Sequence, residues 1–224
     1  MMQISFSDEI RAAAPALRVL VAEAEVTNSP TPDALWHELT DACAEMAGMP
    51  MEAVNKRPAI AATRAAYKAL GKDPNRYRPS AEALCRRAVK GLELYRTTAL
   101  VDLINLLSLR SGHSIGGFDA DAVQGSALRL GRGCAGEPYE AIGRGQLNIE
   151  GLPVWRDAAG GIGTPTSDND RTKMSETTSR LLMTVNIYGP SEMDSEAFEA
   201  LLERLLTAYA GAHEITTHSY SPVP

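Results

Sequence analysis

Residues 97–112 have the sequence TTALVDLINLLSLRSG, and the character of the chain changes where this stretch ends. The apolar run over 97–109 predicts a buried helix through the centre of the protein. Segments with helical patterns precede it, whereas glycines and β-forming residues replace alanines after Gly112. Helices followed by strands in this order predict an α+β fold, with helices packed on a mixed sheet.

Apolar periodicity and capping residues predict the positions of the other helices and strands. We expect helices from Thr31 to Gly48, from Pro58 to Gly71, from a cap at Ser80 to Gly91, and over 194–209, with a short capped turn after Ser7. Alternating or short apolar runs predict strands at 2–6, 17–27, 126–130, 139–142, 146–149, 152–157 and 181–188. We expect residues 1–224 to form a single α+β domain.

Charge is concentrated in residues 57–91, RPAIAATRAAYKALGKDPNRYRPSAEALCRRAVKG. Between Lys56 and Arg110 there are 12 basic and 4 acidic residues, a balance of +8, whereas the rest of the chain carries 10 and 24, a balance of −14. A net charge of −6 argues against a protein that binds DNA or RNA along its whole surface. The basic segment indicates one local anionic partner, such as one end of an RNA, or else a solvated helical face.

Other features narrow the class of protein. No apolar run approaches the roughly 20 residues of a membrane span, and the N-terminus lacks the pattern of a signal peptide. The three cysteines are far apart, which indicates a reduced cytoplasmic protein with no zinc site, and we expect no metal or cofactor. Gly131, Gly133 and Gly136 match GxGxxG, but the Glu-Pro-Tyr that follows favours a turn between strands over a dinucleotide site.

Two polar loops are candidates for chemistry. Residues 111–123, SGHSIGGFDADAV, combine His113 and Asp119 with glycines that permit close ligand approach. Residues 164–172, TPTSDNDRT, follow the Gly-rich run 160–163 and lie between two apolar strands. The second loop is either a ligand-binding loop or a solvated hairpin tip. We expect the two loops to face each other across one pocket, with Arg57 or Arg64 at its rim.

Three segments together resemble one known domain. The run VDLINLLSLRSGHSIGGFDADAV at 101–123 resembles the VD-(I/L)-(T/L)-N…GQPLHAFD-(A/L)-D segment of the bacterial phenylalanyl-tRNA synthetase β subunit. The run LPVWRDAAGGIGTPTSDNDRTKMSETTSRLLM at 152–183 resembles a later segment of that subunit's tRNA-binding and editing domain. The order and spacing of the two agree. With the segment at 57–91, which is typical of free-standing relatives, the resemblance covers about residues 55–190.

The resemblance implies a fold with a mixed, mainly antiparallel β-sheet flanked by helices. It also implies a tRNA-binding protein that acts in trans as an editing deacylase on mischarged aminoacyl-tRNA. The acidic residue that recognises the wrong amino acid in the family falls on Asp170, or on Asp168 in another register. The family's pocket histidine falls on Gly116. A non-catalytic module that binds RNA or an amino-acid-like ligand is the alternative.

The candidate residues fall into three sets. The expected catalytic residues are Asp170, Asp168 and Thr166. The expected substrate-binding residues are Arg57, Arg64, His113, Asp119, Thr164, Asn169 and Arg171. The expected RNA-binding residues are Arg76, Arg78 and Arg86, and the partner is the acceptor end of a tRNA, while the amino acid, the tRNA and the oligomeric state are left open.

Overall fold

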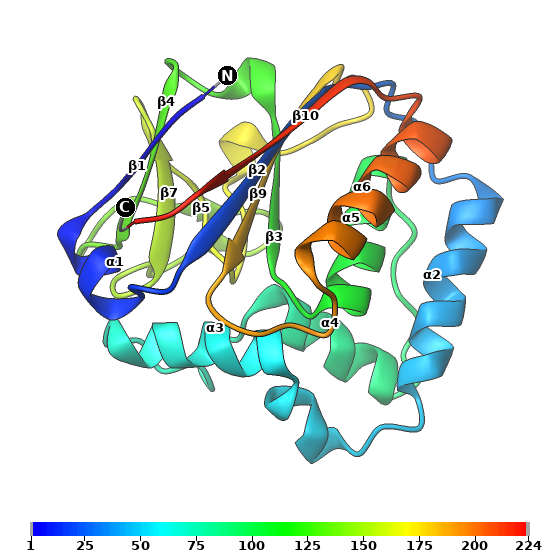
Figure 1. Cartoon of the computed structure of the whole chain (residues 1–224), viewed down its shortest axis with the longest axis horizontal. Helices are drawn as coiled ribbons and strands as arrows, with labels where there is room; N and C mark the ends of the chain where they lie inside the picture. Colours follow the sequence, from blue (N-terminus) through cyan, green and yellow to red (C-terminus); the bar gives the residue numbers. More distant parts are fainter. Residues whose placement is uncertain (1, 223–224) are drawn as a thin grey trace.

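The computed structural model describes residues 2–222 and contains two four-stranded sheets and a layer of helices (Figure 1). The helices are α1 (Asp8–Ala13), α2 (Asp33–Met46), α3 (Pro58–Ala69), α4 (Ser80–Val89), α5 (Ala99–Ser111) and α6 (Ser195–Ala210). Three short 3₁₀ helices are η1 (Met51–Lys56), η2 (Ala120–Ala122) and η3 (Asp170–Thr172). The strands are β1 (Gln3–Phe6), β2 (Arg18–Glu25), β3 (Ile115–Asp119), β4 (Ala127–Arg132), β5 (Glu140–Ala141), β6 (Gly145–Gln146), β7 (Pro153–Asp157), β8 (Gly160–Gly163), β9 (Arg180–Ile187) and β10 (His213–Tyr220).

The strands pair mainly antiparallel. One sheet has the order β1-β4-β7-β8, in which only β1 and β4 run parallel, and the other has the order β10-β2-β9-β3, antiparallel throughout. Strands β5 and β6 form a separate hairpin. The predicted fold, α+β with a mixed, mainly antiparallel sheet flanked by helices, is confirmed.

The second sheet is covered on both faces, and this explains the apolar sequence of β2. Side chains alternate between the two faces of a strand. Val19 and Val21 therefore point into the core shared with the first sheet, while Leu20 and Ala22 point into the core shared with the helices. In Figure 1 helices α2, α5 and α6 stand together on the side of the sheet away from β1 and β4.

Three strands differ from the sequence-based assignment. Residues 115–119 and 160–163 were expected as loops but form β3 and β8, and β10 lies at 213–220, where no strand was expected. The first two are rich in glycine, which weakens any strand pattern. Strand β10 lies at the edge of its sheet, and only partly buried or exposed residues make up its length, so it has no apolar alternation to reveal it. Ser80 is the first residue of α4, not its cap, because Pro79 takes that position.

The glycine-rich run at 131–136 has a structural explanation. The N–H of Gly133 donates to the carbonyl of Leu152, and Gly133 accepts a hydrogen bond from Gly151. A Cβ at Gly133 would lie 2.0 Å from the carbonyl oxygen of Ile149. The run therefore belongs to a close backbone crossing between strands, as the sequence predicts, and no helix begins there.

Residues 2–222 contain neither a helix suited to span a membrane nor a cluster of metal ligands. None of their helices combines the length and the apolar character needed to cross a membrane. They also contain no group of three or more His, Cys, Asp or Glu side chains placed to hold a metal ion.

The crossing at Gly133 gives a test of the fold. We expect Gly133→Ala to lower the free energy of unfolding by roughly 3 kcal/mol or more, because the methyl group must displace main-chain atoms rather than a flexible side chain. Gly48→Ala is the matched control, since no atom lies within 4 Å of its added Cβ. Urea denaturation of both variants measures the difference, and equal stabilities would contradict the crossing.

Candidate functional site

A cavity of about 490 Å³ brings the two polar loops together. Strand β3 contributes Ile115 and Gly117, and the segment after β8 contributes Thr164, Thr166 and Asp168. Helix α5 and the residues before it close the opposite side. The full lining is Ser80, Leu84, Thr97, Thr98, Val101, Ile104, Asn105, Ser108, Ile115, Gly117, Ile142, Arg144, Thr164, Thr166, Ser167, Asp168, Lys173 and Met174. The cavity thus combines apolar side chains with hydroxyl, amide and charged groups, so it can contact both parts of an amphipathic ligand.

Asp168 is the acidic group of this cavity. Its Oδ2 accepts a hydrogen bond from the Gly117 N–H at 3.2 Å, and no basic side chain of residues 2–222 forms an ion pair with it. Asp168 keeps part of its surface open to the cavity, but the carboxyl itself is surrounded by protein. Burial raises the pKa of Asp168 to about 7, against a smaller lowering by the Gly117 hydrogen bond. A carboxyl with this pKa can exchange a proton at neutral pH.

The two threonines hold the loop in shape. The Thr164 hydroxyl accepts from the N–H groups of Thr166 and Ser167 and donates to the Ser167 carbonyl. The Thr166 hydroxyl lies 2.9 Å from the Tyr67 hydroxyl, and both are buried. Thr164 therefore fixes the turn, while Thr166 presents a hydroxyl at the cavity wall and connects it to α3.

Thr98 is a site residue that the sequence analysis missed. It precedes α5 and lines the cavity, yet its hydroxyl makes no cap hydrogen bond. The Thr98 Oγ1 is buried and has no partner among residues 2–222. A buried hydroxyl without a partner is uncommon, and a water molecule or a ligand in the cavity can complete its hydrogen bonding. Its sequence signal, a Thr at a helix start, is the same as that of an ordinary cap.

The remaining residues of the second loop lie elsewhere. Asp170 begins η3, pairs with Lys173 at 2.8 Å and does not line the cavity. Asn169 caps the same turn by accepting from the Arg171 N–H. Arg171 forms a two-pronged ion pair with Asp157, at 3.0 and 2.8 Å. Of the two acidic candidates, the structure places Asp168 and not Asp170 in the cavity, because the loop turns outward after Asn169.

Gly116, where the sequence resemblance places the family's histidine, has close neighbours on its side-chain face. A Cβ there would lie 2.7 Å from the Phe118 ring and 2.9 Å from the Thr184 hydroxyl. A histidine therefore does not fit without movement of both neighbours. Any chemistry in this protein has to proceed without that imidazole.

His113 and Asp119 also lie outside the cavity. His113 is 3% exposed and lines a separate cavity near the start of α6. Asp119 accepts from the Asp121 N–H at the start of η2 and from the Thr178 hydroxyl. These contacts give Asp119 a structural role at the end of β3.

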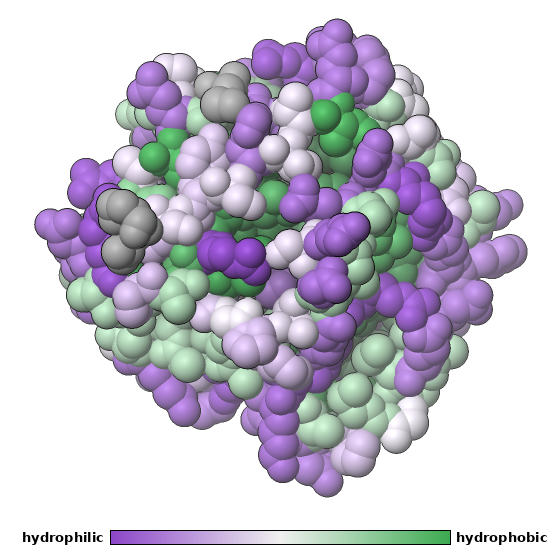
Figure 2. Space-filling model, in the orientation of Figure 1, coloured by the Kyte–Doolittle hydropathy of each residue, from purple (hydrophilic) through white to green (hydrophobic). Residues whose placement is uncertain are grey.

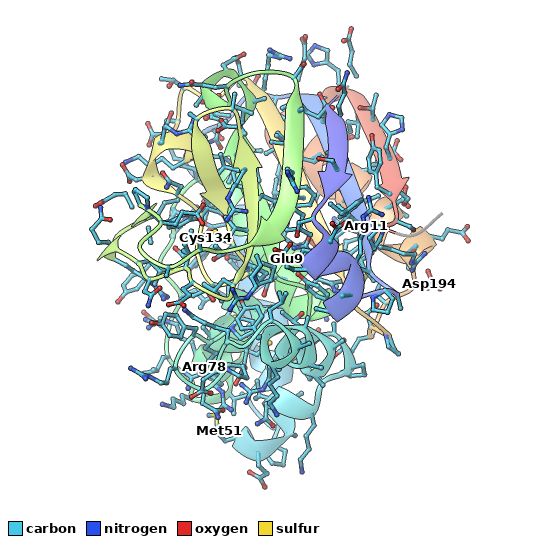
Figure 3. All side chains as sticks on the ribbon, turned by 90° about the vertical axis from the view of Figure 1, so that its left-hand side faces the viewer. Glu9, Arg11, Met51, Arg78, Cys134 and Asp194 are labelled. Atoms are coloured by element: carbon cyan, nitrogen blue, oxygen red, sulfur yellow. The ribbon has the colours of Figure 1, made fainter. Side chains whose placement is uncertain are left out.

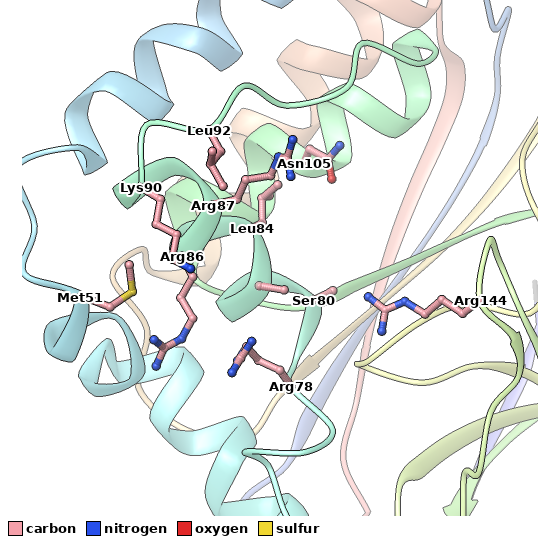
Figure 4. Close-up of a pocket in the computed structure, with 11 residues that line it drawn as sticks. Met51, Arg78, Ser80, Leu84, Arg86, Arg87, Lys90, Leu92, Asn105 and Arg144 are labelled. Atoms are coloured by element: carbon pink, nitrogen blue, oxygen red, sulfur yellow. The ribbon is translucent and has the colours of Figure 1, made fainter.

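A basic cleft of about 560 Å³ adjoins the cavity (Figure 4). Ser80, Leu84, Asn105 and Arg144 line both, so the two hollows lie side by side. Five cations and no acid line the cleft: Arg78, Arg86, Arg87, Lys90 and Arg144. In Figure 4 the Arg144 side chain extends from the β5–β6 hairpin toward Ser80, opposite the cations of α4. Lys90 and Arg144 are exposed and form no ion pair within the described chain.

Several cations of the 57–91 segment are internal. Glu82 is fully buried and pairs with Arg64 at 2.7 Å and Arg86 at 2.8 Å, with Arg78 at 3.5 Å. The Arg64 and Arg86 side chains are only 12% and 23% exposed, whereas Arg78 keeps 44%. This glutamate cluster ties α3, the following loop and α4 together. Arg64 is a structural residue and does not line the cavity.

Arg57 is another internal cation of this segment, whereas Arg76 is exposed. Arg57 is buried, pairs with Glu192 at 2.6 Å, and donates to the Cys85 sulfur and the Leu109 carbonyl. It lines neither hollow, so the expected position of Arg57 or Arg64 at the rim is not found. Arg76 is exposed and lies outside the cleft.

Comparison with known proteins assigns the family. Residues 62–204 match the B3/4 domain. The chain belongs to the B3/4 domain family. This domain is found in the β subunit of phenylalanyl-tRNA synthetase, so the resemblance seen in the sequence is confirmed at the level of the family.

Among solved structures, the B3/4 protein matches an N-terminal fragment of the phenylalanyl-tRNA synthetase β-subunit from Pyrococcus horikoshii, with 11% identity and a TM-score of 0.46. The match covers 95% of this chain and 50% of that fragment, so the chain spans about half of the fragment's length. No curated protein matches the chain.

The stability of a Glu82 variant tests whether this buried glutamate holds its arginine partners in place. We expect Glu82→Gln to lower the free energy of unfolding by about 3 kcal/mol or more, because it leaves Arg64 and Arg86 in a buried site without a counter-charge. Glu93→Gln, an exposed acid just after α4, should change stability by less than about 0.5 kcal/mol. Urea denaturation provides the comparison. If both variants are equally stable, Glu82 does not hold the cluster together.

Proposed function

We propose that this B3/4 protein binds tRNA and hydrolyses mischarged aminoacyl-tRNA in trans, with the aminoacyl ester in the cavity at Asp168. The observation that carries the proposal is that the basic cleft adjoins the cavity and shares four lining residues with it. A charged tRNA combines an anionic backbone with a small, partly apolar amino acid at its end. The two hollows offer a surface of matching chemistry for each part.

The basic cleft supports a polyanionic partner. Its lining has five cations and no acid, on a protein whose net charge is −6. Phosphate oxygens prefer such a surface because each ion pair releases condensed counterions. Arg144 lines both hollows, which suits a phosphate or ribose at the point where the acceptor end enters the cavity.

Asp168 supports the hydrolytic step. In its ionised form it takes a proton from a water molecule as the water oxygen attacks the ester carbonyl carbon. The tetrahedral intermediate then collapses with cleavage of the bond to the ribose oxygen, which takes up a proton. The products are the free amino acid and uncharged tRNA.

Neutral hydroxyls support the developing negative charge. The unpartnered Thr98 hydroxyl and the Thr166 hydroxyl both line the cavity and can donate to the ester oxygen. The Gly160–Gly163 backbone lies in strand β8 and does not line the cavity, so it does not contribute. Asp170 is too far out along the loop to take part, so Asp168 replaces it as the first choice.

One observation favours the alternative, a binding module without chemistry. The family's histidine position holds Gly116, and there is no space for an imidazole. A module of this kind would use the same cleft and cavity to hold a tRNA end or an amino-acid-like ligand. Either protein would meet its partner in the cytoplasm.

The pKa of Asp168 gives the test of chemistry. Because the ionised form is the base, kcat/KM for a mischarged tRNA should rise about tenfold per pH unit below pH 7 and level off above it. Asp168→Asn should lower kcat/KM by roughly 10²–10⁴-fold. Asp170→Asn, on the surface of the same loop, is the matched control and should retain activity. A deacylation screen over mischarged tRNAs identifies the substrate first.

The stability of the Asp168→Asn variant distinguishes a loss of catalysis from a loss of folding. The folded pKa lies above the usual value of 3.8, so the folded state holds this proton more tightly, and that stabilisation is lost as pH rises through 7. Asp168→Asn mimics the protonated form and should be at least as stable as the parent at pH 8. If the parent protein binds tRNA but deacylates no member of the screen, the binding module is the function.

Salt dependence tests the basic cleft. Lys90→Ala with Arg144→Ala should weaken tRNA binding and lower the slope of log affinity against log salt by about 0.7–0.9 for each lost phosphate contact. Arg11→Ala is the matched control, because Arg11 lies on α1, well away from Arg78 (Figure 3). Equal slopes for the parent and the double variant would leave the cleft as a solvated surface.

A further inference from the structure

A second cavity of about 330 Å³ lies between the sheet and the start of α6, and His113 is one of the residues that line it. The imidazole is 3% exposed and packs edge-on against the Phe198 ring, with the ring centres 6.2 Å apart. Its Nδ1 is buried and neither ring nitrogen has a hydrogen-bond partner among residues 2–222. A buried imidazole without a partner indicates a missing ligand or water.

The cavity presents both signs of charge. Arg18 stands on one side, where its guanidinium donates only to the Ser195 hydroxyl, at 3.1 Å. Asp194, the N-cap of α6, and Glu199, on α6, line the same cavity. Asp194 accepts from the Ala197 N–H and Glu199 from the Thr217 hydroxyl, each at 2.8 Å. Within the described chain none of the three has an ion-pair partner, although opposite charges share the cavity. Burial, with smaller effects from Arg18 and Arg57, lowers the pKa of His113 to about 4, so the imidazole is neutral at pH 7 and can donate or accept.

The other walls are apolar. Leu20, Ile187, Met193 and Phe198 contribute to the lining. Figure 2, in the orientation of Figure 1, shows hydrophobic residues set among hydrophilic ones near the centre of this face. Figure 3 shows Asp194 and Arg78 on different sides of the molecule, so this cavity is separate from the basic cleft.

We propose that this second cavity binds a free α-amino acid with an apolar side chain. The carboxylate pairs with Arg18, the ammonium group with Glu199 or Asp194, and the side chain packs on Leu20 and Phe198. His113 completes the site by a hydrogen bond to either charged group. A purely anionic ligand would place its charge beside the carboxylates of Asp194 and Glu199, and a simple amine would leave Arg18 without an ion pair, so a zwitterion satisfies the lining best.

The experiment is a titration of the full chain with each of the twenty protein amino acids, followed by calorimetry and chemical-shift changes. We expect at least one apolar amino acid to bind at millimolar concentration or below. Its amide, which lacks the carboxylate, and its deaminated acid, which lacks the amine, should each bind roughly ten- to a hundred-fold more weakly.

Variants locate the binding. Arg18→Gln and Glu199→Gln should each weaken it by a similar factor, whereas Glu196→Gln, an exposed acid on the same helix, should leave it unchanged. Asp168→Asn should also leave it unchanged, because the proposed deacylase cavity is a different site. The proposal is wrong if no amino acid binds, if Arg18→Gln and Glu199→Gln bind as the parent does with the parent's melting temperature, or if Asp168→Asn abolishes binding.

Discussion

The hydrogen bond from the Gly117 N–H to the Asp168 carboxyl joins the two sheets at the candidate site. Strand β3 is the edge of its sheet, so N–H groups on its free side lack a neighbouring strand. The loop after β8 supplies an acceptor from the other sheet. A side-chain carboxyl thus takes the place that a strand would occupy, and its burial there produces the raised pKa. The raised pKa of Asp168 and the contact between the two sheets therefore have the same physical cause.

The basic segment shows that cations clustered in the sequence need not share one surface of the folded protein. Arg64 and Arg86 turn inward onto the buried Glu82, and Arg57 turns inward onto Glu192. Lys90 and Arg144 keep their charges exposed at the cleft, and Arg144 comes from a hairpin that no count over 57–91 includes. Net charge of a segment therefore indicates that an anion is involved, but only pairing shows whether that anion belongs to the protein or to a partner.

The sequence was a good guide to elements with strong apolar periodicity and a poor guide to the rest. Helix α5 and strand β9 are buried and apolar, and both lie within a residue or two of their predicted bounds. Strands β3 and β8 form through hydrogen bonds to β9 and β7. The sequence did not predict them, because glycines show no alternation of apolar and polar side chains. At the site, the two loops converge as expected, but the register decides between Asp168 and Asp170, and only the backbone path shows which one turns inward. His113 and Thr98 could not be placed from sequence, since their significance lies in partners they lack.

The pairing of β10 with β2 has a consequence for how the chain reaches its native state. Thr217 and His218 lie opposite Ala22 and Val21, so this sheet joins residues almost two hundred positions apart. Closing so long a loop costs entropy before any contact is gained, which slows folding. During synthesis β2 emerges early, but both of its neighbours are late, β9 at 180–187 and β10 at 213–220, so the edge that pairs with β10 stays open longest. The long unpaired interval makes this edge the part of the chain most exposed to aggregation and to binding by chaperones.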